Sequence, residues 1–308
     1  RRSPPARPEG FSHMERVVDR VFPVRIVSAL MHPYVIVDVF TDRPLEGNQL
    51  AVFLEGQAVP EERMQRLARE MNLSETVFVL PAEQGGHARV RIFTPGTELP
   101  FAGHPILGTA WVLAERDGLD RIVLETGSGP VTVEFERAGD RLTSGRMRQP
   151  IPTWAPFDRT EELLAALGVS SSALPVEVYD NGPRHVYVAL ESEEEVAGLR
   201  PDLTALGRLG AIGVNCFAGS GKRWKTRMFG AGLGIVEDPA TGSAAGPLAV
   251  HLARHGRIPF GELIEISQGA EIGRPSTLYA RAVGEGDRID AVEVGGSAVP
   301  VARGEFLL

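Results

Sequence analysis

Two short stretches of this chain share a pattern that could hold a small anion between two helix starts. Residues 100–105 read Pro-Phe-Ala-Gly-His-Pro, and residues 239–244 read Pro-Ala-Thr-Gly-Ser-Ala. Each follows a strand-like run and opens an apolar, alanine-rich segment. The first turn of a helix carries backbone N–H groups that have no partner inside the helix and attract negative charge. If the two stretches face each other, they form two halves of an active site for a small anionic substrate.

Glu75 is the strongest candidate for a catalytic acid or base. It stands immediately before residues 76–80, Thr-Val-Phe-Val-Leu, a strand pattern that is apolar almost throughout. Burial beside a dry pocket raises the pKa of a carboxyl group toward the range in which it can both take and return a proton. The alternative is a solvated acid at the end of a strand, and Glu75 alone does not exclude it.

Five further residues at the two helix starts could bind the substrate. His104 and Ser243 occupy the same position of the two stretches, and each could instead simply cap its helix. Gly103 and Gly242 let a ligand approach the backbone N–H groups closely. Asp238 precedes a proline and is therefore extended, so it can cap the second helix or accept a hydrogen bond from a ligand hydroxyl or ammonium group.

The two stretches belong to a longer repeat. Aligned without gaps, Gly103 meets Gly242 and Leu113 meets Leu252, and upstream residues 91–93, Arg-Ile-Phe, parallel residues 227–229, Arg-Met-Phe. A period this long indicates two similar domains and not a solenoid. Residues 104–114 are apolar on every side, which is typical of a helix buried all round, and a sheet wrapped about it would bury it. We therefore predict two lobes, each a sheet around a central helix.

The lobe boundary is predicted at a proline-rich segment. Residues 149–152 read Gln-Pro-Ile-Pro, which is typical of a linker, so we predict lobes at 31–148 and 149–308. Residues 1–30 carry six arginines and no clean apolar run, and we predict that they form a leader outside the fold. A targeting peptide is the less favoured alternative.

Composition narrows the classes of partner. The chain has 308 residues, with 40 acidic against 32 basic side chains and a net charge of −8, which disfavours nucleic acids and anionic membranes as partners. An apolar run of about 18 residues, as a membrane span requires, is missing from the sequence. Cys216 is the single cysteine, so no internal disulfide can form, and we predict a cytoplasmic protein.

Three tempting patterns lack a residue that their chemistry requires. The glycine-rich residues 230–234 lack the third glycine of a dinucleotide fingerprint, and residues 216–223 lack the first glycine and the final Ser or Thr of a P-loop. His251 and His255 are one helical turn apart, but Leu252 replaces the glutamate of a zinc protease. We predict that these histidines lie on a helix surface and that the chain has no metal site.

Three runs of the sequence resemble the PhzF family of isomerases: residues 72–75 (Asn-Leu-Ser-Glu), 93–105 and 237–246. Further similar segments are residues 149–154, 181–185 and 273–276, and the resemblance extends from about Met31 to the C-terminus. It implies an α+β fold of the diaminopimelate-epimerase type, with two similar lobes, each a mixed β-sheet rolled into a barrel around a central helix, and a site in the cleft between them. It also implies a homodimer without a cofactor.

The resemblance further implies an isomerase of phenazine biosynthesis that converts trans-2,3-dihydro-3-hydroxyanthranilate into a reactive aminoketone. Glu75 matches the family's acid/base, which moves a proton from the hydroxyl-bearing ring carbon to the carboxylate-bearing one. The residues that match substrate-binding positions are His104, Asp238 and Ser243, with the Gly103 and Gly242 amides near the carboxylate.

Two rival functions remain open at this point. Epimerases and racemases of this fold invert a stereocentre with a cysteine at each helix start, whereas Cys216 lies away from both starts. A relative that acts on another small cyclic or amino-acid-like acid is the main alternative. A catalytically silent protein that binds an anthranilate-like ligand is the second.

Overall fold

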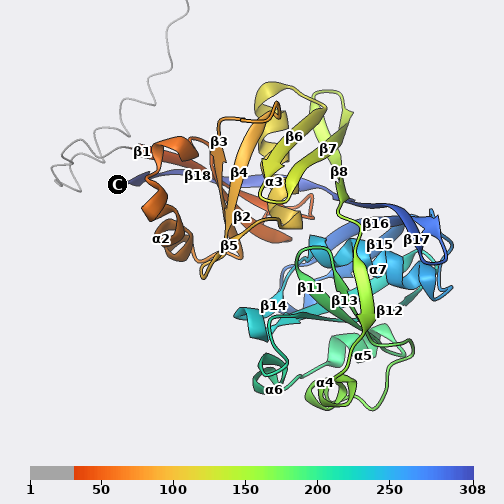
Figure 1. Ribbon diagram of the computed structural model, residues 1–308. Coiled ribbons are helices and arrows are strands. Elements are labelled where there is room, and N and C mark those ends of the chain that lie inside the picture. The colour runs from red at the N-terminus through yellow and green to blue at the C-terminus, as the bar shows by residue number, and fades with distance from the viewer. Residues whose placement is uncertain (1–30) are drawn as a thin grey trace, which may run out of the picture.

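A mixed, 18-stranded sheet and its helices form two lobes in the computed structural model, which describes residues 31–308 (Figure 1). The leader predicted for residues 1–30 lies outside the described residues. The combination of one mixed sheet with few helices confirms the predicted α+β class. Within residues 31–308, no helix is both long and apolar enough to cross a membrane.

The first lobe alternates parallel and antiparallel strand pairs. β2 pairs in parallel with β3, β3 is antiparallel to β4, and β4 is parallel to β6, after which β6, β7 and β8 form an antiparallel meander. In chain order the elements are β1 (Met31–Val39), β2 (Asn48–Phe53), η1 (Gly56–Ala58), α2 (Glu61–Met71), β3 (Glu75–Leu80), β4 (Ala88–Phe93), β5 (Glu98–Leu99), α3 (Gly103–Asp117), β6 (Arg121–Thr126), β7 (Gly129–Ala138) and β8 (Arg141–Gln149).

The second lobe repeats this order of pairs. β11 is parallel to β12, β12 is antiparallel to β13, β13 is parallel to β15, and β15, β16 and β17 form the meander, so the predicted repeat is present in the fold. Its elements are β9 (Thr153–Pro156), α4 (Thr160–Leu167), β10 (Glu177–Asp180), β11 (Arg184–Ala189), α5 (Glu193–Gly198), α6 (Leu203–Gly207), β12 (Gly213–Ser220), β13 (Arg223–Gly230), η2 (Ala231–Leu233), β14 (Ile235–Asp238), α7 (Gly242–Arg254), β15 (Ile264–Gln268), η3 (Ala270–Ile272), β16 (Ser276–Glu285) and β17 (Arg288–Gly296).

The central helices α3 and α7 are enclosed, as their apolar sequences predict. Every residue from Gly103 to Ala114 and from Gly242 to Ala253 is buried. α3 packs against strands of its own lobe, among them β1, β2, β6 and β8, and α7 packs against β16 and β17. Gly108 brings α3 close to the sheet, because an added Cβ would lie 2.7 Å from the Val39 side chain. This packing fixes where both helices begin.

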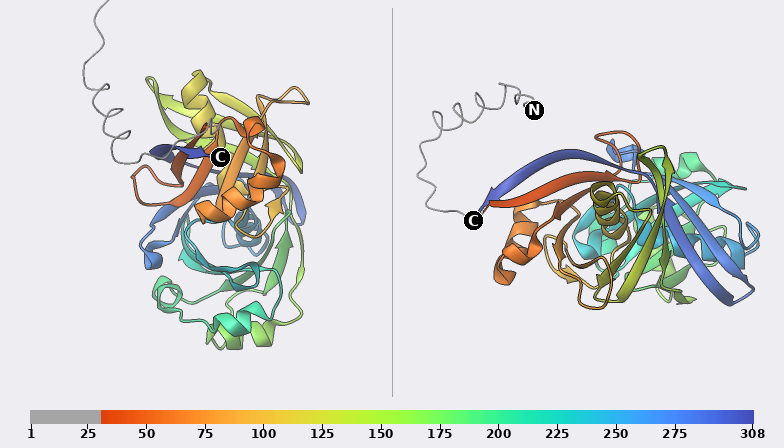
Figure 2. Two further views of the ribbon diagram at one scale, coloured as in Figure 1. Left: turned by 90° about the vertical axis from the view of Figure 1, so that its left-hand side faces the viewer. Right: turned by 90° about the horizontal axis from the view of Figure 1, so that it is seen from above.

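The chain crosses between the lobes twice. β8 of the first lobe pairs antiparallel with β17 of the second, and residues 150–152 then lead into β9. After β17 the chain returns, and β18 (Ala298–Leu307) pairs antiparallel with β1 along its whole length, as the view from above shows (Figure 2). The division into 31–148 and 149–308 stays a prediction, and the strand pairing adds that the last strand joins the sheet of the first lobe.

Arg274 links the two lobes through an ion pair and two carbonyl contacts. It lies between η3 and β16 of the second lobe, and its Nη2 donates to Asp38 Oδ1 at 2.7 Å and to Glu46 O at 2.6 Å. Its Nε donates to Gly47 O at 2.9 Å. Asp38 is 1% exposed, so its carboxylate depends on these protein partners and not on water. The link holds the loop after β1 against the second lobe.

We expect Arg274→Ala to lower the free energy of unfolding by about 3 kcal/mol, because removing one partner of a buried ion pair leaves the other charge uncompensated. Chemical denaturation of the purified variant measures this loss. Arg43→Ala, which alters an exposed residue of the same loop, is the matched control and should change stability by less than about 0.5 kcal/mol. Equal stabilities for the two variants would contradict the role given to Arg274.

Candidate active site

The starts of α3 and α7 meet in the middle of the molecule. A Cβ added to Gly103 would lie 2.9 Å from both the Gly242 carbonyl carbon and the Ser243 nitrogen, so the two backbones are in contact. The N-cap residues, Ala102 and Thr241, make no side-chain cap hydrogen bond to their helices. His104 and Ser243 are each the second residue of a helix, so the alternative that they are caps is wrong. No side-chain cap therefore competes with a ligand for the first N–H groups of either helix.

A cavity of about 360 Å³ lies at this meeting point. Its wall contains residues of both lobes, and it is more apolar than polar. The six residues that the sequence predicts for the site all line it: Glu75, Gly103, His104, Asp238, Gly242 and Ser243. The apolar part of the wall includes Leu99, Phe101, Met228, Leu233 and Ile235. Such a cavity, small and apolar with a few convergent polar groups, suits one small ring.

Glu75 is the first residue of β3 and is 8% exposed, which excludes the solvated strand-end alternative. Burial raises the pKa of the Glu75 carboxyl well above its ordinary value, and the nearby Asp238 carboxylate raises it further. Its Oε2 lies 3.2 Å from His104 Nε2, but among residues 31–308 neither atom has a hydrogen-bond partner. Both atoms are therefore left for groups of a bound molecule.

His104 is neutral in this site. Burial lowers the pKa of its imidazole to about 3, far below physiological pH. Because the imidazole is neutral, the close approach of His104 and Glu75 is not an ion pair. A neutral imidazole can donate a hydrogen bond through one ring nitrogen and accept one through the other.

Asp238 has both carboxylate oxygens engaged by protein donors. Asn48 Nδ2 donates to Oδ1 at 3.0 Å, and the Thr241 hydroxyl donates to Oδ2 at 2.6 Å. Burial raises the pKa of Asp238 to about 6, although these two hydrogen bonds oppose the rise. Gln268 fixes the same turn, because its Nε2 donates to Asp238 O at 2.8 Å and to Thr241 Oγ1 at 2.9 Å. The side chain is thus held in one orientation.

Sequence reasoning missed several of these positioning residues. Asn48 starts β2 in the first lobe, yet its amide bonds Asp238 and the Ala240 carbonyl in the second lobe, at 3.0 and 2.9 Å. Gln149 ends β8, and its Nε2 donates to Gly242 O at 2.8 Å. Gln149 belongs to a segment that the sequence analysis identified, but the partners of both residues are about 90 or more residues away along the chain. Only the fold reveals such pairs.

The two lobes differ at the position of Glu75. Thr76 pairs with Phe93 in the first lobe, and Val214 pairs with Phe229 in the second. Because the repeat aligns Phe93 with Phe229, the counterpart of Glu75 is Gly213, the first residue of β12. The carboxyl group of the first lobe therefore has no equivalent at this position of the second.

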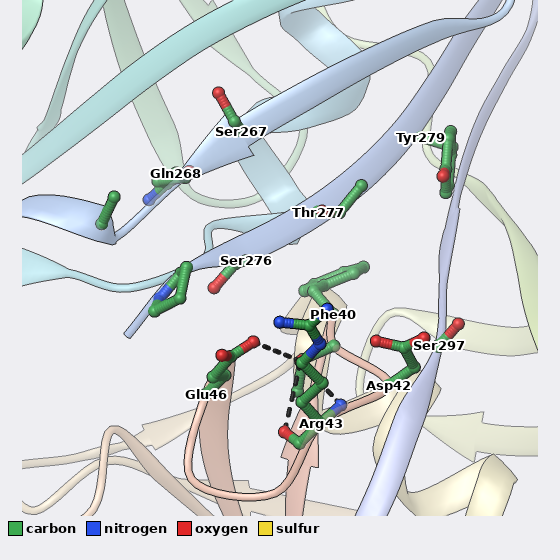
Figure 3. A pocket seen from close by; sticks show the side chains of 13 residues that line it. Phe40, Asp42, Arg43, Glu46, Ser267, Gln268, Ser276, Thr277, Tyr279 and Ser297 are labelled. Carbon is green, nitrogen blue, oxygen red and sulfur yellow. Dashed lines mark hydrogen bonds between the residues drawn. The ribbon is translucent and has the colours of Figure 1, made fainter. Parts of the chain in front are cut away.

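A second hollow, of about 420 Å³, lies away from these residues (Figure 3). The turn after β1 and strands β15 and β16 line it, and its wall holds Asp42, Arg43, Glu46 and several hydroxyl groups. Gln268 is shared with the turn that holds Asp238. The hollow contains no other member of the helix-start site, so we place the chemistry in the smaller cavity.

The expectation that His251 and His255 lie on a helix surface is wrong for His251, whereas His255, the residue that caps the end of α7, is partly exposed. His251 is fully buried, and with His255 and Glu177 it forms a group whose potential ligand atoms lie within 4.8 Å of one another. Glu177 Oε2 also accepts from Arg254 Nη1 at 2.9 Å and from Tyr179 at 2.9 Å. The Arg254 guanidinium, so close to Glu177, would repel a divalent cation. These side chains are therefore better explained as a cluster of ion pairs and hydrogen bonds around the Glu177 carboxylate than as a metal site. The absence of a metal site stays a prediction.

Comparison with known proteins places the chain in a family. The family model described as phenazine biosynthesis-like protein, PhzC-PhzF, matches residues 37–304. The chain belongs to this family. A family relative from Pseudomonas aeruginosa, named trans-2,3-dihydro-3-hydroxyanthranilate isomerase, is 56% identical over 278 residues, which cover 90% of this chain and all of the relative. A relative of the same name from Pseudomonas chlororaphis is 53% identical with the same coverage.

Solved structures of the PhzC-PhzF family share the fold. The phenazine biosynthesis protein of Bacillus anthracis matches with a TM-score of 0.79 and 26% identity, covering 91% of this chain and all of that one. A hydroxyproline epimerase from Agrobacterium vitis matches with a TM-score of 0.62 at 12% identity, which shows a common fold and nothing about activity. The predicted resemblance to PhzF proteins and to the epimerase fold is thereby confirmed.

Proposed function

We propose that this chain is an isomerase of phenazine biosynthesis that acts on trans-2,3-dihydro-3-hydroxyanthranilate, with Glu75 as the single acid/base. The observation that carries the proposal is that Glu75 has a buried carboxyl oxygen without a hydrogen-bond partner in the cavity, whereas both oxygens of Asp238 accept hydrogen bonds. The names of the relatives at 56% and 53% identity support the substrate.

The geometry suits movement of a proton within one molecule better than inversion of a stereocentre. Inversion needs a base on each side of the substrate, but the position equivalent to Glu75 in the second lobe is Gly213. The proton donor and acceptor carbons of the substrate are separated by one ring atom. One carboxyl group can therefore reach both from the same face of the ring.

In the proposed reaction, ionised Glu75 takes the proton from the hydroxyl-bearing ring carbon. The electrons of the broken C–H bond move through the conjugated diene, and the carboxylate-bearing carbon takes the proton back from Glu75. The product is an enol, which becomes the aminoketone when its hydroxyl proton moves to carbon. Each double bond shifts by one position, so the step needs no oxidant or reductant. We propose that it proceeds without a cofactor.

The remaining site residues provide the binding contacts in this proposal. The uncapped N–H groups at Gly103 and Gly242 face the substrate carboxylate, because helix starts favour an anion. Ser243 binds the same carboxylate, while His104 and Asp238 bind the amino and hydroxyl groups. A homodimer, a cytoplasmic location and the absence of nucleic-acid partners stay predictions.

Conversion of the substrate in D₂O tests the proposal. We expect the wild-type protein to form the aminoketone with deuterium at the carboxylate-bearing carbon, because the proton that Glu75 has taken exchanges with solvent before it is returned, and NMR of the product measures this. A silent ligand-binding protein would bind the substrate without conversion. Unconverted substrate would reject the proposed activity, and turnover of another small cyclic or amino-acid-like acid would identify the alternative.

A further inference from the structure

His185 occupies the space that a second Glu75 would need. It lies on β11, beside Gly213 of β12, and a Cβ added to Gly213 would approach His185 Nδ1 to 2.6 Å. The first lobe places the Glu75 carboxyl against His104 at its helix start, whereas the second lobe places an imidazole against Ser243. His185 is 2% exposed and lines the cavity. Loss of the side chain at 213 thus makes room for this ring.

The hydrogen bonds around His185 determine which of its nitrogens carries the proton. Asn215 Nδ2 donates to the Gly213 carbonyl at 3.1 Å, and a carbonyl can only accept, so the amide nitrogen is the group that faces both partners. The same Nδ2 lies 3.3 Å from His185 Nδ1. His185 Nδ1 is therefore an acceptor. Burial lowers the pKa of His185 to about 4, so the ring is neutral and its one proton is on Nε2.

This tautomer determines what the Ser243 hydroxyl can do. His185 Nε2 lies 3.0 Å from Ser243 Oγ, and as the protonated nitrogen it donates to that oxygen. The hydroxyl hydrogen of Ser243 is then not needed for His185. Because Ser243 lines the cavity at an uncapped helix start, its hydrogen can point to an anionic oxygen there. Asn181 Nδ2 holds the backbone by donating to Ser243 O at 3.0 Å.

We infer that His185 is a positioning residue that, with Asn215, orients the Ser243 hydroxyl as a donor to the substrate carboxylate. The inference rests on the proposed function, in which Ser243 binds that carboxylate. His185 takes no part in proton transfer to carbon. The Ser243 hydroxyl hydrogen can point either toward His185 or into the cavity, and the donor on His185 leaves only the second direction. A charged carboxylate in the cavity is therefore bound more strongly than a neutral group in its place.

A comparison of two analogues isolates this effect from a general loss of structure. The probes are 3-hydroxyanthranilate, which carries the carboxylate on an aromatic ring, and its neutral carboxamide. For His185→Phe, which keeps a ring but loses the donor, we expect about 10- to 100-fold weaker binding of the carboxylate, because the Ser243 hydroxyl is no longer held as a hydrogen-bond donor to the charged group. Binding of the carboxamide should change less than about 3-fold. Isothermal calorimetry measures both affinities.

Two further variants make the test specific to Ser243. Ser243→Ala should weaken carboxylate binding to a similar degree, and His185→Phe added to it should cause no further loss, because His185 acts only through that hydroxyl. His185→Gln, whose amide can donate to Ser243, should recover most of the affinity. The inference would be overturned if His185→Phe weakened carboxylate binding equally in the wild-type and Ser243→Ala proteins. It would also be overturned if His185→Phe left carboxylate binding unchanged.

Asn215→Leu gives an independent test if His185→Phe does not fold. It removes the donor that fixes the tautomer and keeps the side-chain size, so carboxylate affinity should fall by about 5-fold or more, again only while Ser243 is present. Unchanged affinity would overturn the inference. Failure of the proposed function gives a different result from failure of this inference. In the first case the wild-type protein leaves trans-2,3-dihydro-3-hydroxyanthranilate unconverted, whatever the His185 variants do to analogue binding.

Discussion

Replacing Glu75 with glutamine is expected to lower kcat by about 10³- to 10⁴-fold while changing the affinity for 3-hydroxyanthranilate by less than about 3-fold. Glutamine keeps the shape of the side chain but can neither take nor return a proton. The binding groups, at the two helix starts, are on other residues. Steady-state kinetics with the dihydro substrate and calorimetry with the aromatic analogue separate the two effects.

The same substitution should make the protein more stable, with an effect that depends on pH. The Glu75 pKa is raised in the folded state, whereas an unfolded glutamate titrates at about 4.3. Between these two pKa values the folded state holds more protons than the unfolded state, so the free energy of unfolding falls as pH rises. A glutamine side chain does not titrate, so the variant does not lose free energy of unfolding in this way as pH rises. The melting temperature of the variant should exceed that of the wild type, by more at about pH 8 than at about pH 5.

Glu70→Gln, a change at an exposed position of α2, is the matched control and should affect neither kcat nor the pH dependence of melting. Near wild-type turnover by Glu75→Gln would end the assignment of Glu75 as the acid/base. Lost turnover without the gain in stability would show instead that the carboxyl is ionised in the folded state and that burial does not raise its pKa.

The sequence predicts the central part of the site because that part is local. A proline, a glycine and an apolar segment in close succession predict a helix start, and their repetition predicts a second one. The strand that Glu75 opens is apolar almost throughout, and all six of its residues, Glu75 included, are buried. The apolar sequence of this strand thus predicts that the Glu75 carboxyl group is buried.

The surroundings of the site depend on contacts between distant segments, which local patterns do not record. Asn48 and Asp238 are 190 residues apart, and His185 and Ser243 are 58 apart. The pairing of β18 with β1 likewise joins the two ends of the described chain. His251 was misplaced for a related reason, since a charged partner, Glu177, lies inside the fold and satisfies a histidine on an otherwise apolar helix.

Gly103→Ala should reduce both stability and activity, although helix propensity alone predicts the opposite sign. Alanine in place of glycine within a helix normally stabilises it by up to about 1 kcal/mol. Here the added Cβ would lie 2.9 Å from two backbone atoms of α7, the Gly242 carbonyl carbon and the Ser243 nitrogen. Backbone atoms in an enclosed helix cannot rotate away, so the two helix starts must move apart. We expect a loss of about 1–3 kcal/mol in the free energy of unfolding.

The expected loss of kcat/KM for Gly103→Ala is about 100-fold, because displacement of binding groups by about 1 Å is enough for such an effect. Gly198→Ala is the matched control: Gly198 ends α5, and a Cβ there would meet nothing within 4 Å. Denaturant titration and steady-state kinetics of both variants give the comparison. If Gly103→Ala proved as stable and active as Gly198→Ala, the helix starts would tolerate separation, and their contact could not be what positions the substrate carboxylate relative to Glu75.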